Sequence, residues 1–267
     1  MKHHLVVFCI KFINIFHPKF AYLLFKKKLL TSKNISGQWP KKIEQKVIET
    51  EFGKVNTYKY GKGKCIWLVH GSSNAYQLMP LMKNLDKYGY SCIAIEYHPN
   101  DNENISLTKW IKAFDFATQR IIPPSHVVTH GLGASVLGNS RWFSNYSDDL
   151  TVISPVLNYK NSLDAYVNKN NLPKMLLSKL INEIYKVDKV KMKELDATSS
   201  INRFQGRLSI FYSKLDGISS VEAINDLSDK NNRKIVHFKG ATTHRIINSR
   251  SLVCNIQVGG MKLDIAV

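Results

Sequence analysis

The chain has 267 residues, 44% of them hydrophobic, and this length favours one α/β domain with a large core over two small domains. Its 38 lysines and arginines outnumber its 20 aspartates and glutamates, which gives a formal net charge of +18. The four cysteines are far apart and form no C-x-x-C pair, which argues against a zinc site and indicates core thiols of a reducing compartment.

The first 46 residues carry half of the net charge, with ten lysines and one acidic residue, Glu44. Two apolar runs, LVVFCI and FAYLLF, lie among these lysines. Two interpretations of residues 1–45 as a basic amphipathic arm stay open. The arm is either a helix that packs on the domain with its lysines in solvent, or a segment whose first 30 residues lie on an anionic membrane surface.

The sequence predicts neither a transmembrane span nor nucleic-acid binding. The longest uninterrupted apolar runs of the arm have six residues, too few for a transmembrane span. Nucleic-acid binding is not expected, because the sequence has no helix-turn-helix, no ribonucleoprotein aromatic signature and no zinc-finger spacing. We therefore expect a cytoplasmic protein, with the inner face of the membrane as the alternative place for the arm.

Alternating runs at 46–52 and 54–60 predict an antiparallel hairpin around Gly53. Buried strands are then expected at 64–70, 91–97, 126–130 and 149–155, because these runs are continuously apolar. Helical spacing predicts helices at 75–89, ending at Gly89, and at 106–122, beginning at Ser106, with a further helix from near Gly133. Strict alternation of strand and helix predicts a mostly parallel, doubly wound sheet.

Residues 156–203 interrupt this alternation, because their apolar residues have helical spacing and no strand intervenes. We expect a helical cap there, inserted into an α/β domain of residues 46–267. Strands at 206–213 and 233–239 follow, with a helix between them at 221–229 and another after Arg245. The ending, residues 255–267, gives no prediction, because two glycines interrupt what should be the last helix.

Three residues with chemical potential follow predicted strands in chain order: Gly131 in THGLGAS, Asp216 in YSKLDG, and His244 in ATTH. Ligand sites of open α/β sheets form beyond the carboxyl ends of the strands, so these positions should lie at one edge. The sequence HGSSNAY follows another strand. A turn there can aim the N–H of Ser72 or Ser73 at an oxyanion, with the Leu132 N–H as second donor.

With these motifs the sequence resembles the α/β-hydrolase superfamily, in particular bacterial carboxylester-hydrolase-like members with a basic N-terminal helix. The resemblance covers roughly residues 16–256. LVHGSS, which contains Gly71, resembles the oxyanion turn of the family, VVTHGLGAS its GHSxGG elbow, YSKLDGISS its acid turn and ATTHRII its histidine loop. It implies an α/β-hydrolase fold in which Asp216 is the acid, His244 the base and Gly131 the nucleophile position.

Three positions depart from the family pattern. Gly131 stands where the family has Ser, Cys or Asp, Thr129 where it has Gly or Ala, and residues 96–103 lack the DxxGxGxS turn. A nucleophile elbow strains any residue that has a Cβ, and glycine relieves this strain. Gly131 therefore favours the elbow geometry and removes the attacking oxygen.

Replacement nucleophiles find little support in the sequence. Ser135 lies one turn into the predicted helix rather than at the tip of the elbow, and Ser72 and Ser73 have no evident base. His244 could instead activate a water molecule, for a residual effect of roughly 10³-fold over water. Simpler interpretations make Asp216 a turn residue and His244 a surface residue. His70 and His130 are interpreted as packing or turn residues.

Three hypotheses remain. The chain is a non-catalytic member that binds a small acyl or ester-like molecule or a protein partner, a serine hydrolase whose serine has been replaced, or an interaction protein that works through its basic arm. We favour a carboxylester-hydrolase-like protein of weak or no activity. No cofactor and no metal ion are predicted.

Overall fold

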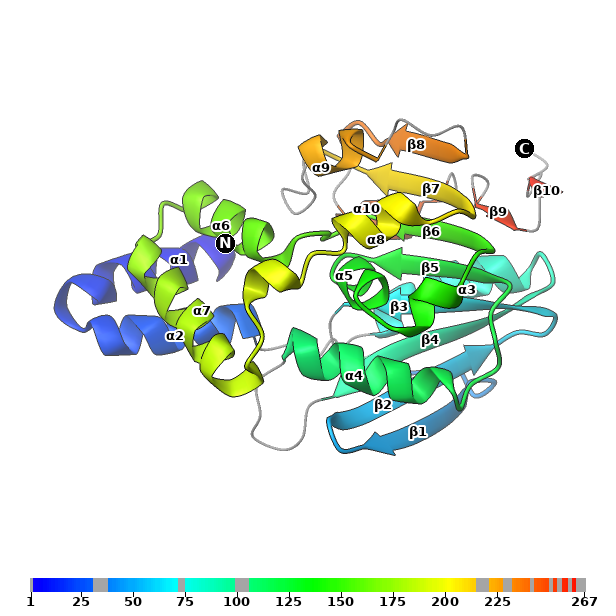
Figure 1. Ribbon diagram of the computed structural model, residues 1–267, viewed down its shortest axis with the longest axis horizontal. Helices are drawn as coiled ribbons and strands as arrows, with labels where there is room; N and C mark the ends of the chain where they lie inside the picture. Colours follow the sequence, from blue (N-terminus) through cyan, green and yellow to red (C-terminus); the bar gives the residue numbers. More distant parts are fainter. Residues whose placement is uncertain are drawn as a thin grey trace.

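The computed structural model describes residues 2–30, 38–71, 75–98, 106–214, 221–227, 232–240, 243–249, 252–253, 256–258 and 261–262. An eight-stranded sheet crosses the molecule in the order β1-β2-β4-β3-β5-β6-β7-β8 (Figure 1). None of the helices in these ranges has both the length and the apolar character needed to cross a bilayer.

The sheet is antiparallel at one edge and parallel elsewhere. Strands β1 (Glu44–Thr50) and β2 (Gly53–Tyr60) form the predicted hairpin, and β2 pairs antiparallel with β4. Gly53, at φ +128°, allows this hairpin to lie close to β4, because a Cβ there would come within 2.6 Å of the His98 carbonyl oxygen. The parallel part consists of β3 (Lys64–His70), β4 (Tyr90–His98), β5 (His126–His130), β6 (Asp149–Ile153), β7 (Arg207–Tyr212) and β8 (Arg233–His237).

Helices cover both faces of the sheet, as the apolar strands require. One face packs on α3 (Met79–Asp86) and α10 (Thr243–Ile247). The other packs on α4 (Leu107–Thr118), α5 (Gly133–Gly138), α8 (Thr198–Arg203) and α9 (Val221–Asn225). The structure confirms the mostly parallel, doubly wound sheet.

Several helix bounds differ from prediction. The helix expected at 75–89 begins as a 3₁₀ turn, η1 (Ala75–Leu78), and continues as α3 to Asp86, with a proline in its first turn, where the missing N–H costs nothing. Ser106 caps α4 as predicted, its hydroxyl accepting from the Lys109 N–H at 3.2 Å, but α4 ends at Thr118 rather than at 122. Helix α10 begins at Thr243, before the predicted Arg245. The other 3₁₀ turns in the described ranges are η2 (Trp142–Asn145) and η3 (Met192–Glu194).

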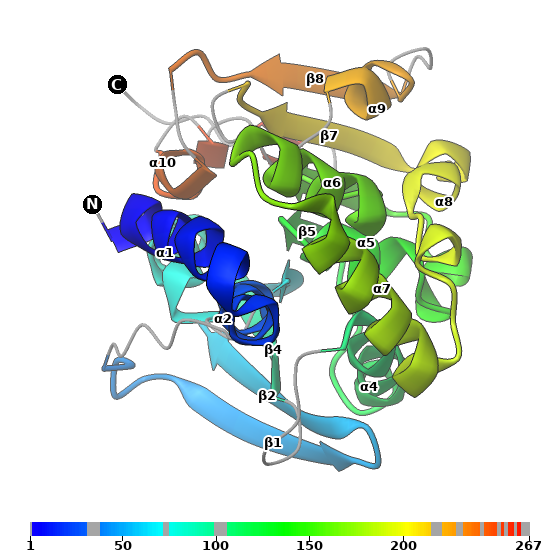
Figure 2. The ribbon, with the colours of Figure 1, turned by 90° about the vertical axis from the view of Figure 1, so that its left-hand side faces the viewer.

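Four helices form a cap beyond the carboxyl ends of the parallel strands (Figures 1 and 2). Two of them, α6 (Tyr159–Lys169) and α7 (Lys174–Asp188), come from the predicted insertion. The other two are α1 (Lys2–Phe16) and α2 (Pro18–Leu30), and all four share one apolar cluster. The N-terminal residues therefore complete the cap.

The end of the chain adds a small antiparallel pair, β9 (Gln257–Val258) and β10 (Met261–Lys262), where no element was predicted.

Candidate functional site

The turn after β5 joins a strand to a helix through a residue with a left-handed backbone. Gly131 has φ +57° and leads directly into α5. Its N–H donates to the Ile153 carbonyl oxygen at 3.0 Å, and its own carbonyl oxygen accepts from the Val156 N–H at 3.0 Å. The turn is thus fixed to the end of β6 and to the loop that follows.

Position 131 has room for a side chain. A Cβ built on Gly131 would meet no heavy atom of the described residues within 4 Å. Against these residues, the steric cost of a side chain is that of the left-handed backbone, on the order of 1–3 kcal/mol. The described residues therefore leave space for a side chain at position 131.

The turn after β3 lies against the elbow through two glycines. A Cβ on Gly71 would lie 2.5 Å from the Cα of Leu132, and one on Gly133 would lie 2.8 Å from the carbonyl carbon of Val69. Only residues without a Cβ permit this approach. The backbones of Gly71 and Leu132 therefore lie in close contact. The Leu132 N–H makes no backbone hydrogen bond within the described part of the chain. Ser72 and Ser73 lie outside the described residues.

The structure describes the predicted acid and base residues only in part. Strand β7 ends at Tyr212, and Asp216 lies outside the described residues. His244 is the second residue of α10, and the structure describes its backbone but not its side chain. In the sheet, β6 lies between β5, which precedes Gly131, and β7, which precedes Asp216.

Two histidines flank the turns and pack on each other. His70 ends β3 and His130 ends β5, and they are partners in the sheet register. Both are buried, with ring centroids 4.8 Å apart. This geometry agrees with their interpretation as packing residues beside the elbow.

Ser135 is a structural residue. It is fully buried in α5, and its hydroxyl donates to the Val156 carbonyl oxygen. The hydroxyl ties the helix to the loop that also holds Gly131, which leaves it turned away from the tip of the elbow.

Ser154 is a residue next to the elbow that the sequence did not single out. It follows β6 directly, has φ +44° and is fully buried. Its hydroxyl has no hydrogen-bond partner in the described ranges. A serine before a proline is expected to be extended, so no local signal predicts this left-handed backbone. Strained residues with unsatisfied groups are concentrated at functional sites.

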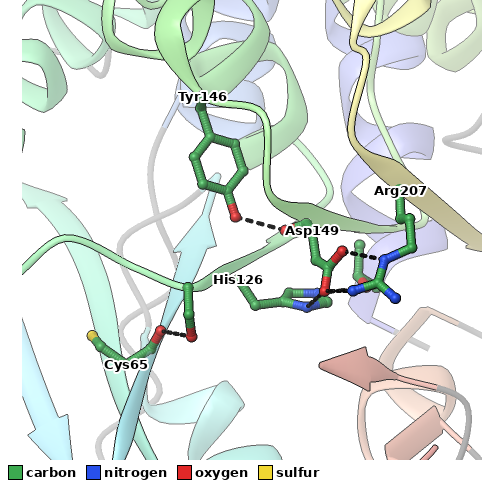
Figure 3. A network of polar contacts seen from close by, with 7 residues as sticks. Cys65, His126, Tyr146, Asp149 and Arg207 are labelled. Carbon is green, nitrogen blue, oxygen red and sulfur yellow. Dashed lines mark hydrogen bonds and ion pairs between the residues drawn. The ribbon is translucent and has the colours of Figure 1, made fainter. Parts of the chain in front are cut away.

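A second polar cluster lies at the opposite end of the strands (Figure 3). His126, Asp149 and Arg207 are the first residues of β5, β6 and β7 and are aligned in register. Arg207 makes two hydrogen bonds of 2.7 Å to the Asp149 carboxylate, and these raise the pKa of Arg207. The His126 Nδ1 lies 3.9 Å from the same carboxylate. This cluster clamps the amino ends of three strands, far from the carboxyl edge where ligand sites form.

Comparison with known proteins gives a match in structure only. No protein-family model matches the chain. No curated protein matches it in sequence. Among solved structures, esterase 2 of Thermogutta terrifontis superposes with a TM-score of 0.56 at 14% identity, covering 78% of this chain and 87% of the esterase. An esterase of Pyrococcus furiosus gives a TM-score of 0.54 at 17% identity, covering 81% and 91%.

The chain has the α/β-hydrolase fold. A thioesterase domain from the curacin biosynthetic pathway also superposes, with a TM-score of 0.55 at 12% identity and coverage of 78% and 96%. In this α/β-hydrolase fold, the turn after β3 and the turn after β5 meet at the carboxyl edge of the sheet, beside the cap. At such low identities the comparison supports the fold, and the chemistry of the site depends on its own residues.

Proposed function

We propose that this protein is a carboxylester-hydrolase-like member of the fold that binds a small acyl or ester-like molecule and turns it over weakly or not at all. The observation that carries the proposal is Gly131: a left-handed, hydrogen-bonded turn with open space where a nucleophile side chain would stand. The close contact of Gly71 with Leu132 supports a pair of backbone donors beside that space.

The chemistry follows from what remains at position 131. A serine there would attack the acyl carbon, pass its proton to His244 and release the alcohol, and a water molecule would then free the acid. With glycine, a water molecule would have to attack the same carbon and give its proton to His244. That route lacks a fixed nucleophile, which is why we propose little or no turnover.

Restoring the oxygen tests the proposal. The natural chain, Gly131→Ser and Gly131→Ala are exposed to a fluorophosphonate probe and to short-chain nitrophenyl esters. We expect labelling and turnover by Gly131→Ser alone, since alanine adds the same strain without the oxygen. His244→Ala added to Gly131→Ser should lower that turnover at least about 100-fold.

Ligand binding is tested separately by titration calorimetry. Structures of the Thermogutta esterase were obtained with butyrate and with propionate bound, so these two carboxylates are suitable probes. We expect the natural chain to bind them. If a folded Gly131→Ser variant neither reacts with the probe nor hydrolyses the esters, the proposal that Asp216 and His244 act as acid and base is wrong. If neither carboxylate binds, the proposed binding of a small acyl molecule is wrong.

A further inference from the structure

Helix α1 is apolar on two opposite faces. Val7 and Ile10 face inward and are buried in the cap cluster. The outer face carries large apolar side chains at spacings of three and four residues, all exposed: Leu5, Phe8, Phe12, Ile15 and Phe16. An apolar outer face on a helix that already packs inward through its opposite face indicates contact with another apolar phase.

The outer aromatic side chains form a continuous strip. Phe8, Phe12 and Phe16 are 63%, 56% and 65% exposed. Their rings follow one another along the helix, with centroid distances of 6.3 Å from Phe8 to Phe12 and 5.6 Å from Phe12 to Phe16. Phe20 and Leu23 of α2 are also more than half exposed. We call these seven residues, Leu5, Phe8, Phe12, Ile15, Phe16, Phe20 and Leu23, the outer strip.

The outer strip is unusual within this molecule. Of the thirteen exposed large hydrophobic side chains in the described ranges, seven belong to these two helices. Single exposed apolar residues are normal, whereas a group on one helical hairpin marks a surface that meets another apolar phase.

The lysine and acidic side chains of α1 and α2 are all of one sign. Residues 2–30 contain six lysines and no aspartate or glutamate. Lys27 is exposed on the same face of α2 as Phe20 and Leu23, and the partly exposed Lys11 lies one turn from Phe8 and one turn from Ile15. Aliphatic lysine stems can lie along apolar surface while the ammonium groups reach phosphate groups.

Contacts with α7 hold the α1–α2 helical hairpin in the cap. The Glu183 carboxylate of α7 accepts hydrogen bonds from Tyr22 and Lys26 of α2. The Lys179 ammonium lies 4.3 Å from the centroid of the Tyr22 ring. Helices α1 and α2, which carry the outer strip, thus belong to a folded cap beside the carboxyl ends of the parallel strands (Figures 1 and 2).

We infer that the outer strip of α1 and α2 docks the protein on an anionic phospholipid bilayer, with its aromatic side chains among the acyl chains and its lysines at the headgroups. A second copy of the chain fits this surface poorly, because two acid-free, lysine-bearing faces would repel each other. The inference goes beyond the proposed function and does not depend on turnover.

The full-length chain is sedimented with vesicles of phosphatidylcholine alone and of phosphatidylcholine mixed with phosphatidylglycerol. We expect binding to the anionic vesicles that weakens as salt rises. The triple variant Phe8→Ser, Phe12→Ser, Phe16→Ser should lower the partition coefficient roughly 100-fold or more. The matched control is Val47→Ser, Phe116→Ser, Ile122→Ser, which removes exposed apolar groups elsewhere and should bind like the natural chain.

A series of lysine variants separates the electrostatic contribution to vesicle binding from the apolar one. Lys11→Gln, Lys19→Gln, Lys27→Gln should weaken binding to anionic vesicles roughly 100-fold. Lys41→Gln, Lys62→Gln, Lys64→Gln removes the same charge from exposed sites elsewhere and should have a much smaller effect. Unchanged thermal unfolding shows that each variant is folded.

Two results would overturn the inference. One is equal sedimentation of the natural chain and the Phe8, Phe12, Phe16 variant with anionic vesicles. The other is self-association in light scattering that this variant abolishes while vesicle binding is absent, which would assign the outer strip to a second copy. The Gly131 variants should bind vesicles like the natural chain, so failure here and failure of the proposed function are distinguishable.

Discussion

Glycines at turns of this chain differ in what a side chain would meet among the described residues. At Gly131 and Gly89 the backbone is left-handed, with φ +57° and +76°, and a Cβ would meet nothing within 4 Å. At Gly133 a Cβ would press on the backbone of Val69, which is held in the sheet. Positions 131 and 89 favour glycine because of their backbone angles, whereas position 133 requires glycine because a Cβ has no space there.

This difference predicts the cost of three alanine variants. Gly131→Ala and Gly89→Ala should each lower the free energy of unfolding by about 1–2 kcal/mol, because both add the same backbone strain. Gly133→Ala should cost about 3 kcal/mol or more, since a strand must shift. Urea unfolding measures all three. A cost for Gly131→Ala far above that for Gly89→Ala would mean that position 131 is not open.

Polar contacts between elements act at both ends of the molecule. Asp149 and Arg207 align the amino ends of β6 and β7, and Glu183 joins α7 to α2. Neither pairing could be predicted from the sequence. The first depends on the strand register, which is known only once the sheet order is known. The second joins residues 161 positions apart, Tyr22 and Glu183.

The α2–α7 contact should depend on pH. Burial of Glu183 opposes its charge, but hydrogen bonds from Lys26 and Tyr22 outweigh this and hold the pKa of Glu183 below its usual value. A carboxylate whose pKa is lower in the folded than in the unfolded chain stabilises the fold above the unfolded pKa, roughly 4.3. That stabilisation is lost as the pH falls through the folded pKa.

Glu183→Gln should therefore lower the thermal unfolding temperature at neutral pH, and the difference from the natural chain should shrink progressively below roughly pH 4. Circular dichroism at several pH values measures this. The exposed Glu194, also in the segment after β6, provides the control Glu194→Gln. A deficit of Glu183→Gln that is the same at neutral and acid pH would show that the carboxylate charge is not what joins the helices.

Most of the sheet could be predicted because its strands are continuous apolar runs and its helices carry clear signals, such as the Ser106 cap. A turn between a strand and a helix at Gly131 was predictable from the chain order. The backbone of Ser154 was not, since a residue before a proline is expected to be extended and Ser154 is left-handed. The sequence predicts an arm for the N-terminal residues because their partners, α6 and α7, follow more than a hundred residues later.

The described residues form three apolar clusters, one on each face of the sheet and one in the cap. Tyr159, at the start of α6, packs on both the cap cluster and the cluster beneath α4 and α5. Few other apolar side chains are shared in this way, so the cap is expected to open without unfolding the sheet.

A matched pair of variants on α2 tests this division. Phe25 is fully buried in the cap cluster, whereas Phe20 is 55% exposed on the same helix. Phe25→Ala should destabilise the cap by about 3–4 kcal/mol through the cavity it leaves, and Phe20→Ala by less than about 0.5 kcal/mol. Amide hydrogen exchange should then show faster exchange for Phe25→Ala in α1, α2, α6 and α7, with β5 and β6 unchanged. Equal acceleration in the cap and the sheet would mean that the clusters unfold as one cooperative unit, and that the N-terminal helices stabilise the elbow as well as the cap.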